Sequence, residues 1–346
     1  MKNFKIQRGL FTAMEILVIK LGAIGDVIRT TTILPGLKAK YKNCTIDWVT
    51  KKESFDILKN NNSIGKIYLI NNKLRNKKYD LVINLDDDYE ACKLASSINS
   101  KKIIGAYLDK NKLRYTNDSA LWFDMGLLSR FGKQKADQLK AKNKKAYQEI
   151  MYKILNLKYN EQEPILNLDK KSLNFGKKFA IRNKIKKSDK IIGINTGAGG
   201  RWKDKKLSIE KTSELIDKLN NQIKNSKILL FGGPEEKKRN KKIKNLVKAD
   251  IIDAGCDNSL TEFASLVNLC NVLVTSDSLA LHIGVALKKK IVVFFGPTSS
   301  NEIELYGRGI KIIPKIGCLC CYKSKCDITP EYDVDEMVKA VKQYFF

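Results

Sequence analysis

The sequence consists of two successive series of short apolar segments, each followed by an amphipathic helical stretch. The first series begins with Glu15–Lys20 (EILVIK) and the second with Lys190–Asn195 (KIIGIN). Strands that alternate with helices in this way form parallel sheets with right-handed crossovers, and the helices cover both sheet faces. The sequence therefore predicts an α/β protein with two Rossmann-like, doubly wound domains.

The two series are separated by a polar helical stretch, Ala136–Leu155, and a proline-containing segment. We place an N-terminal extension at 1–13, the first domain at 14–165, the second domain at 166–330 and a C-terminal helix at 331–346. Open α/β sheets bind ligands at the carboxyl ends of their strands. Two such domains predict one substrate per domain and chemistry in the cleft between them.

The chain is strongly basic, with 65 Lys and Arg against 37 Asp and Glu and a formal net charge of +28. Such a charge attracts polyanions, including nucleic acid, anionic lipid and nucleotide sugars. Compositional drift towards lysine is the alternative explanation. Because no aromatic-rich basic stripe or nucleic-acid module is visible, we expect no specific nucleic-acid partner.

No apolar run approaches the ~20 residues needed to span a bilayer, and we expect no signal peptide. A cytoplasmic protein keeps its thiols reduced, so the eight cysteines are expected to be free.

The segment Leu21–Asp26 (LGAIGD) connects the first strand to a helix expected from about Asp26 to Lys40. Glycines there let another molecule approach the backbone, and we assign Gly22 and Gly25 to the acceptor side. Asp26 stands where a dinucleotide fold binds phosphate, which it would repel. It suits a base that removes a proton from a hydroxyl. The alternative is that it caps the helix and complements the helix dipole.

Three adjacent carboxylates, Asp86, Asp87 and Asp88, end the strand Asp80–Leu85. Such a group could hold Mg²⁺ or Mn²⁺ together with a nucleotide sugar. It lies in the first domain, away from the expected phosphate site. We therefore interpret it as a helix cap and a polar cleft wall, with Asp86 on the acceptor side.

The second domain begins with a basic, glycine-rich loop, Asn195–Lys206 (NTGAGGRWKDKK). Backbone amides with Arg201, Lys203, Lys205 and Lys206 would form a cradle for a diphosphate, and we assign Thr196 to the donor side as well. A mobile basic loop is the alternative.

The segment Thr275–His282 (TSDSLALH) follows an apolar strand and opens a helix. Free amides and the hydroxyls of Ser276 and Ser278 could bind phosphate, and Asp277 could take a ribose hydroxyl. His282 is the only histidine of the chain. It is either a packed, hydrogen-bonded residue or a catalytic one.

A dense thiol cluster near the C-terminus comprises Cys318, Cys320, Cys321 and Cys326. Thiolates bind zinc or iron, but this spacing differs from that of paired C-x-x-C knuckles. We predict free or regulatory thiols, with Cys318, Cys321 and Cys326 as the candidates should a metal bind.

These motifs, in this order, resemble glycosyltransferase family 9, the lipopolysaccharide heptosyltransferases. The similarity runs from about Met14 to the C-terminus. It rests on ILVIKLGAIGDVIRTTTILPGLK, YDLVINL, the glycine-rich loop, LLFGGPEE, SDSLALHIGVAL, FFGPT and the cysteine loop before ITPE. The family's cysteine pattern is matched at three positions, and the fourth is missing.

The resemblance implies a GT-B fold, an ADP-heptose donor and an inverting, metal-independent transfer without a cofactor. It also implies that Asp26 is the general base, that Lys205 binds the donor phosphates and that Glu235 lies at the adenosine end. Further contacts to the nucleotide diphosphate are implied for Asp277, Ser278, Leu279 and His282.

The expected acceptor is an anionic glycolipid of the lipopolysaccharide inner core, reached from the cytoplasm by peripheral contact with the inner membrane. Two alternatives stay open. One is a relative that transfers another sugar or uses a protein acceptor, and the other is a catalytically silent polyanion-binding protein.

Overall fold

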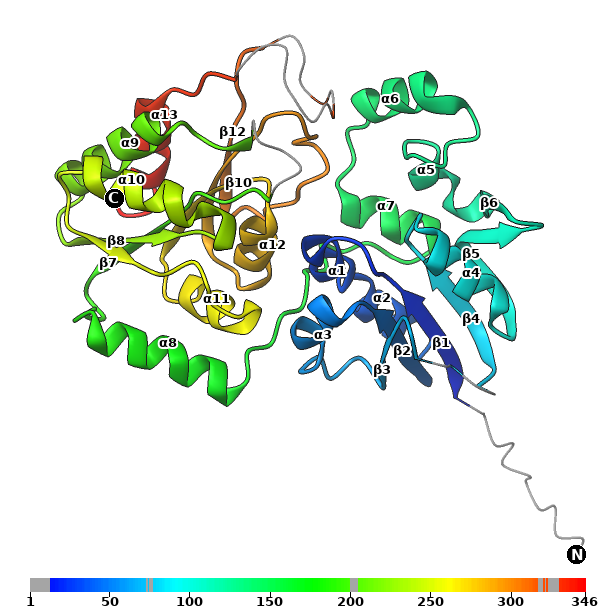
Figure 1. Ribbon diagram of the computed structural model, residues 1–346. Helices are drawn as coiled ribbons and strands as arrows, with labels where there is room; N and C mark the ends of the chain where they lie inside the picture. Colours follow the sequence, from blue (N-terminus) through cyan, green and yellow to red (C-terminus); the bar gives the residue numbers. More distant parts are fainter. Residues whose placement is uncertain are drawn as a thin grey trace, which may run out of the picture.

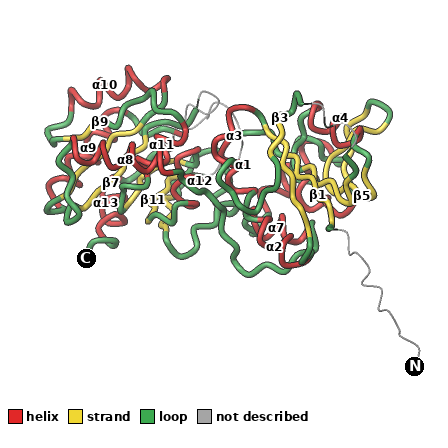
Figure 2. The backbone as a smooth tube through the Cα atoms, turned by 90° about the horizontal axis from the view of Figure 1, so that it is seen from below, coloured by secondary structure: helices red, strands yellow, loops and turns green. Residues whose placement is uncertain are grey.

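The computed structural model describes residues 13–72, 74, 77–199, 205–316, 320, 322 and 330–346. It contains two six-stranded sheets, each flanked by helices (Figure 1). Viewed from below, the two halves lie side by side, with α1 (Ile24–Thr30) and α12 (Leu279–Ala286) between the sheets (Figure 2). The predicted pair of Rossmann-like domains is confirmed.

The first sheet has the strand order β3-β2-β1-β4-β5-β6. Its strands are β1 (Met14–Ile19), β2 (Cys44–Thr50), β3 (Ile67–Leu69), β4 (Tyr79–Asn84), β5 (Ser100–Asp109) and β6 (Lys112–Tyr115). The first five strands pair in parallel, and β6 runs antiparallel to β5. Lys110 and Asn111 have φ of 44° and 64°, the backbone of a tight two-residue hairpin turn. This hairpin was not predicted from the sequence.

The helices of the first half are α1 (Ile24–Thr30), α2 (Ile33–Lys40), α3 (Lys52–Leu58), α4 (Tyr89–Ser97), α5 (Ala120–Phe123), α6 (Gly132–Lys142) and α7 (Tyr147–Ile154). Two expected helices are each divided in two. The helix expected at Asp26–Lys40 breaks after Thr30, where the Thr30 and Thr31 hydroxyls donate to carbonyls one turn back at 2.6 and 2.7 Å. Such bonds compete with the helix ladder. The stretch Ala136–Leu155 is interrupted between α6 and α7.

The second sheet has the order β12-β11-β10-β7-β8-β9, and all its pairs are parallel. Its strands are β7 (Lys190–Asn195), β8 (Ser226–Phe231), β9 (Ile251–Asp253), β10 (Val272–Ser276), β11 (Lys290–Phe294) and β12 (Gly309–Ile312). In order of appearance along the chain, both sheets therefore have the same arrangement, 3-2-1-4-5-6. This arrangement places a switch point between the first and fourth strands of each sheet.

The helices of the second half are α8 (Lys170–Arg182), α9 (Ile209–Gln222), α10 (Lys237–Leu246), α11 (Leu260–Val267), α12 (Leu279–Ala286) and α13 (Val334–Lys342). Ser208 caps α9, because its hydroxyl accepts from the Lys211 amide at 3.1 Å. The final helix α13 packs on the second sheet, where Met337 and Val341 are fully buried. No helix of the described part of the chain is long and apolar enough to cross a membrane.

The two halves also share buried apolar surface. Ile28 of α1 and Ile57 of α3 belong to the same buried cluster as Ala280 and Ile283 of α12. Because these side chains come from both halves and exclude water together, their packing holds α1 against α12.

Candidate active site

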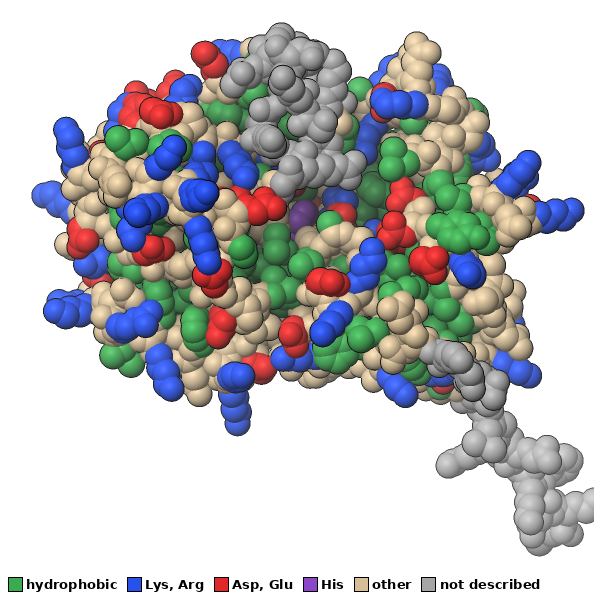
Figure 3. All heavy atoms as spheres, viewed as in Figure 1, with side chains coloured by type: hydrophobic (Ala, Val, Ile, Leu, Met, Phe, Trp, Pro, Cys, Tyr) green, Lys and Arg blue, Asp and Glu red, His purple; other side chains and the backbone are tan. Residues whose placement is uncertain are grey.

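Most of the predicted site residues that the structure describes lie at the switch points of the two sheets, whereas Glu235 follows β8. In the first sheet they follow β1 and β4, and in the second they follow β7 and β10. Figure 3 shows the chain's only histidine, in purple, in a hollow between the two halves. The two switch points therefore meet across one hollow.

Asp86 holds the glycine-containing loop that precedes α1. Its carboxylate accepts the backbone amides of Leu21 at 2.5 Å and Gly22 at 2.7 Å. The Lys20 ammonium donates to the Leu85 carbonyl at 3.0 Å and lies 3.5 Å from the Asp86 carboxylate. Asp86 is buried, so these contacts compensate its charge. It positions the loop, and the expected helix cap is not seen.

The other two carboxylates of this run have separate roles. Asp88 occupies the N-cap position of α4 without a side-chain cap hydrogen bond and pairs with Lys51 at 3.2 Å. Burial and the neighbouring Asp86 raise the pKa of Asp87 above its ordinary value. Among the described residues, no group of three or more His, Cys, Asp or Glu side chains could hold a metal ion.

Asp26 lies in the first turn of α1, with a third of its side chain exposed. The N-cap residue of α1 is Ala23, so Asp26 does not cap this helix. Its carboxylate pairs with the Arg29 guanidinium at 2.8 Å. Burial opposes ionisation, but Arg29 and Lys20 outweigh it and lower the pKa of Asp26 below its ordinary value. Asp26 is therefore an ionised carboxylate at neutral pH.

Gly25 brings the two halves into close contact. A Cβ atom at this position would lie 2.4 Å from Cδ2 of His282 on α12, so a larger residue does not fit here. His282 is mostly buried, and its Nε2 lies 3.9 Å from the Asp277 carboxylate. Burial and Arg29 lower the pKa of His282 to about 4, so the ring is neutral at pH 7. The structure shows His282 as a residue packed at the contact between the halves.

In the second half, Lys205 and Asp277 form a nearly buried ion pair. The Lys205 ammonium lies 3.0 Å from the Asp277 carboxylate and 2.9 Å from the Asp277 carbonyl. The Thr298 hydroxyl donates to the same carboxylate at 2.7 Å. Burial works against the charge, yet Lys205 and His282 lower the pKa of Asp277. The predicted phosphate-binding lysine is therefore already neutralised by a carboxylate.

A second lysine is neutralised in the same way. The Lys206 ammonium donates to Glu236 at 2.5 Å, and the other oxygen of Glu236 accepts the Gly233 amide at 3.0 Å. Glu236 is buried, whereas Glu235, the predicted residue for the adenosine end, is exposed. The carboxylate that is buried beside Lys206 is therefore Glu236, and the role of Glu235 stays a prediction.

The remaining predicted residues are also located at the second switch point. The Thr196 hydroxyl is buried and donates to the Phe231 carbonyl at 3.0 Å. Ser276 is buried at the end of β10, and Ser278 begins α12 with its hydroxyl 3.1 Å from that of Thr275. Leu279 packs against the apolar cluster between the halves. Arg201, Cys318, Cys321 and Cys326 lie outside the described residues.

The second half encloses a cavity of about 10 Å³. Its lining includes Thr196, Lys205, Lys206, Arg239 and Ser276. Sites for small molecules usually measure about 300–1,000 Å³, so this space holds no nucleotide as it stands.

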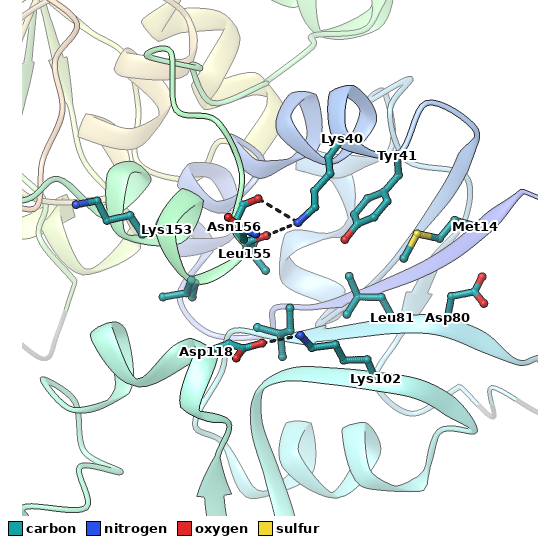
Figure 4. Close-up of a pocket in the computed structure, with 12 residues that line it drawn as sticks. Met14, Lys40, Tyr41, Asp80, Leu81, Lys102, Asp118, Lys153, Leu155 and Asn156 are labelled. Carbon is teal, nitrogen blue, oxygen red and sulfur yellow. Dashed lines mark hydrogen bonds and ion pairs between the residues drawn. The ribbon is translucent and has the colours of Figure 1, made fainter.

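A larger hollow, of about 470 Å³, lies elsewhere (Figure 4). It opens at the amino ends of the first sheet's strands, near Met14 and Asp80, on the edge opposite the switch point. Its charged groups are paired locally, since Lys102 bonds Asp118 at 2.7 Å and Lys40 donates to the Leu155 and Asn156 carbonyls. This hollow does not belong to the site.

Sequence reasoning missed Arg29 and Glu302, which lie beside Asp26 and the contact between the halves. The Arg29 guanidinium is 4.0 Å from the buried Glu302 carboxylate. The spacing of Arg29, one helical turn after Asp26, is a local signal that could have revealed this pair. Glu302 offers no such signal, because it is far away in the sequence.

Comparisons with known proteins agree with this architecture. The profile of glycosyltransferase family 9 (heptosyltransferase) matches residues 67–331. The chain is 25% identical over 318 residues to lipopolysaccharide heptosyltransferase 1 of Campylobacter coli, which covers 83% of this chain and 85% of that protein. It is 26% identical over 229 residues to lipooligosaccharide heptosyltransferase 2 of Campylobacter jejuni, covering 58% of this chain and 66% of that protein.

Solved structures show the same fold. A family 9 glycosyl transferase from Veillonella parvula has a TM-score of 0.75 at 19% identity, covering 96% of this chain and 97% of its own. The ADP-heptose lipopolysaccharide heptosyltransferase II of Escherichia coli has a TM-score of 0.64 at 17% identity, covering 96% and 100%. With the family profile matching well over half of its length, the chain belongs to glycosyltransferase family 9, the heptosyltransferase family.

Proposed function

We propose that the protein is an inverting glycosyltransferase that moves heptose from ADP-heptose to a hydroxyl of a lipopolysaccharide inner-core or related anionic glycoconjugate acceptor. Family membership supports this proposal, as do relatives named as lipopolysaccharide and lipooligosaccharide heptosyltransferases. A solved Escherichia coli relative contains ADP, and another structure of it contains ADP-2-deoxy-2-fluoro heptose. The first domain, 14–165, would bind the acceptor and the second, 166–330, the donor.

One observation carries the proposal most directly. The ionised carboxylate of Asp26 lies on α1, which packs against the α12 helix that carries His282, close to the Lys205–Asp277 pair. The proposed base of one domain therefore lies across the contact between the halves from the Lys205–Asp277 ion pair of the other. This arrangement suits a reaction in which a hydroxyl loses a proton while a diphosphate departs.

In this mechanism Asp26 accepts the proton of the acceptor hydroxyl. The acceptor oxygen forms a bond to the anomeric carbon from the face opposite the leaving group. The bond from that carbon to the diphosphate oxygen breaks, and ADP leaves with the electron pair. Attack from the opposite face inverts the anomeric configuration.

Lys205 and Lys206 would stabilise the departing diphosphate. Each is paired with a carboxylate, so the donor phosphates compete with Asp277 and Glu236 for these ammonium groups. The lysines would supply the charge that a divalent cation supplies in metal-dependent transferases. We therefore expect transfer to continue in the presence of EDTA.

The net charge of +28 also fits the proposed acceptor. Basic residues near an anionic surface each contribute about 1 kcal/mol to membrane attraction. We propose peripheral contact with the cytoplasmic face of the inner membrane, where an anionic glycolipid is presented.

Donor binding, measured by calorimetry, tests the proposal. The purified protein is titrated with ADP-heptose, UDP-glucose and GDP-mannose, each with and without EDTA. Selective binding of ADP-heptose that persists in EDTA is expected. Selective binding of another nucleotide sugar would contradict the donor assignment, and loss of binding in EDTA would contradict metal independence.

A further inference from the structure

Arg29 connects Asp26 to the second half of the molecule. One guanidinium nitrogen lies 2.8 Å from Asp26 Oδ1, and the other terminal nitrogen lies 4.0 Å from Glu302 Oε2. Asp26 and Arg29 are on α1, whereas Glu302 follows β11 in the second sheet. The arginine side chain is 13% exposed. A single, mostly buried cation therefore lies between carboxylates from both halves.

Aromatic rings hold the guanidinium in place. Its Cζ lies 3.9 Å from the ring centroid of Tyr147 and 5.9 Å from that of Trp122. The two rings contact each other edge to face, with centroids 5.1 Å apart. A planar guanidinium stacks on such rings, whereas an ammonium is a point charge without a preferred plane. The rings therefore restrict the orientation of the arginine.

The aromatic support is itself fixed to both halves. The Tyr147 hydroxyl hydrogen bonds the Thr30 hydroxyl of α1 at 2.7 Å. The Tyr147 backbone amide donates to the Glu302 carbonyl at 3.0 Å. The ring beneath the guanidinium is thus bonded to the helix that carries Asp26 and to the segment that carries Glu302.

We propose that Arg29 is a positioning residue that orients the Asp26 carboxylate and aligns it with the second domain through Glu302. Arg29 holds Oδ1, and we assign the acceptor proton to Oδ2. Among the described residues, Arg29 is the one whose side chain pairs with this carboxylate. The inference rests on the proposed role of Asp26 as the base.

Other titratable groups share this environment. Around Asp26 and Arg29 they are Lys20, Tyr147, Asp277, His282 and Glu302. Burial raises the pKa of Asp26, and Arg29 provides the largest opposing effect. Loss of the Arg29 charge leaves burial less compensated, so the carboxyl of Asp26 must then ionise at higher pH.

An experiment that needs no acceptor tests this consequence. The side-chain carboxyl carbon of Asp26 is followed by ¹³C NMR as pH is lowered, and its signal is assigned by its absence in Asp26→Asn. In the unmodified protein we expect the pH midpoint of the Asp26 titration to lie below the ordinary aspartate value. In Arg29→Gln we expect this midpoint to rise by about one pH unit or more. Arg182→Gln is the matched control, because Arg182 lies over the Phe179 ring at 5.6 Å on the exposed surface of α8. An unchanged midpoint in Arg29→Gln would overturn the inference.

Transfer kinetics provide the second readout. Heptose-deficient lipooligosaccharide serves as the acceptor and ADP release as the signal. For Arg29→Gln we expect kcat to fall about tenfold to hundredfold, because a misoriented base loses its alignment with the hydroxyl. We also expect the acid limb of the pH profile to move to higher pH, while donor affinity stays within about twofold of the original.

Arg29→Lys separates orientation from charge, and it also serves if Arg29→Gln does not fold. The charge is retained, so the Asp26 midpoint stays near its original value, whereas kcat falls because the planar group is lost. Undiminished kcat in Arg29→Lys would overturn the positioning role. Undiminished transfer by Asp26→Asn would instead overturn the proposed function, whatever the Arg29 variants do.

Discussion

The two halves of the site have the same strand order, but their charged side chains are paired differently. In the first half, the carboxylate of Asp26 remains partly exposed beside a fixed arginine. In the second half, the ammonium groups of Lys205 and Lys206 are each held by a carboxylate. A base must keep an accessible oxygen for its proton, whereas a phosphate site must keep its cations stable before the ligand arrives. The same arrangement of strands therefore carries a partly exposed carboxylate, Asp26, in one half and lysines that are paired with carboxylates in the other.

The largest expected effect is on the rate of transfer, and it tests Asp26 as the proposed proton acceptor. Asp26→Asn preserves the shape of the side chain but removes its basicity. We expect transfer to fall about 10²–10⁴-fold, as is usual for loss of a general base. Initial rates of ADP release measure this fall.

Calorimetric donor affinity and thermal unfolding are the controls for Asp26→Asn. Both are expected to change little, because the proposed donor site lies in the other half. A weakened donor affinity equal to the loss of rate would show that Asp26 acts in binding instead.

The second prediction concerns Lys205, which is paired with the Asp277 carboxylate. Lys205→Met leaves the Asp277 carboxylate nearly buried without its lysine, and breaking a buried pair costs about 3–5 kcal/mol of unfolding free energy. We expect donor affinity to fall about tenfold to hundredfold, the equivalent of one or two charge-assisted hydrogen bonds. Chemical denaturation and calorimetry measure the two effects.

The double variant Lys205→Met with Asp277→Asn isolates the stability effect. Removing both charges should restore much of the stability, while donor affinity stays weak. Recovery of donor affinity in the double variant would contradict a direct role for the lysine.

The third prediction concerns His282, at the contact between the halves, and the pH dependence of the free energy of unfolding. The pKa of His282 is about 4 in the folded protein, below the ordinary value of 6.5. Between these two values the unfolded chain binds more protons at this residue, so stability falls as pH is lowered from 6.5 towards 4. The loss amounts to at most about 3 kcal/mol, because one pKa unit corresponds to 1.36 kcal/mol. Denaturation at several pH values measures it.

His282→Asn should flatten this pH dependence above pH 4. Asp26 and Asp277 have lowered pKa values, so their contribution is lost only at still lower pH. An equal slope between pH 6.5 and 4 in the variant would show that another group is responsible.

The smallest expected effect compares two adjacent residues. Glu236→Gln loses the charge that pairs with Lys206, and we expect a loss of about 1–3 kcal/mol in unfolding free energy. Glu235→Gln is the matched control, and because its side chain is exposed we expect a change within about 0.5 kcal/mol. Thermal and chemical unfolding measure both. Equal effects in the two variants would contradict the different burial of the two carboxylates.

Much of the fold could be predicted because its signals are local. The strand Lys190–Asn195 is an apolar run, and Ser208 is a typical helix cap. The division of the first helix was missed because the Thr30 and Thr31 hydroxyls bond to carbonyls of their own helix, which apolar periodicity does not reveal. The hairpin of β5 and β6 was missed because Lys110-Asn111 is a weak turn signal.

The sequence by itself determined the two βα series, the position of Asp26 after strand β1 and the basic loop after strand β7. Each of these features depends only on the order of residues in a short segment. Only the tertiary structure decided that Asp86 holds the loop before α1, that Glu236 rather than Glu235 is buried, and that Arg29 lies between Asp26 and Glu302. Glu235 and Glu236 are adjacent in the sequence, and only one of their side chains is buried. The contacts of Asp86 and of Glu302 join residues that are distant in the sequence. Charge pairing across such distances depends on how the two sheets pack, which no local pattern encodes.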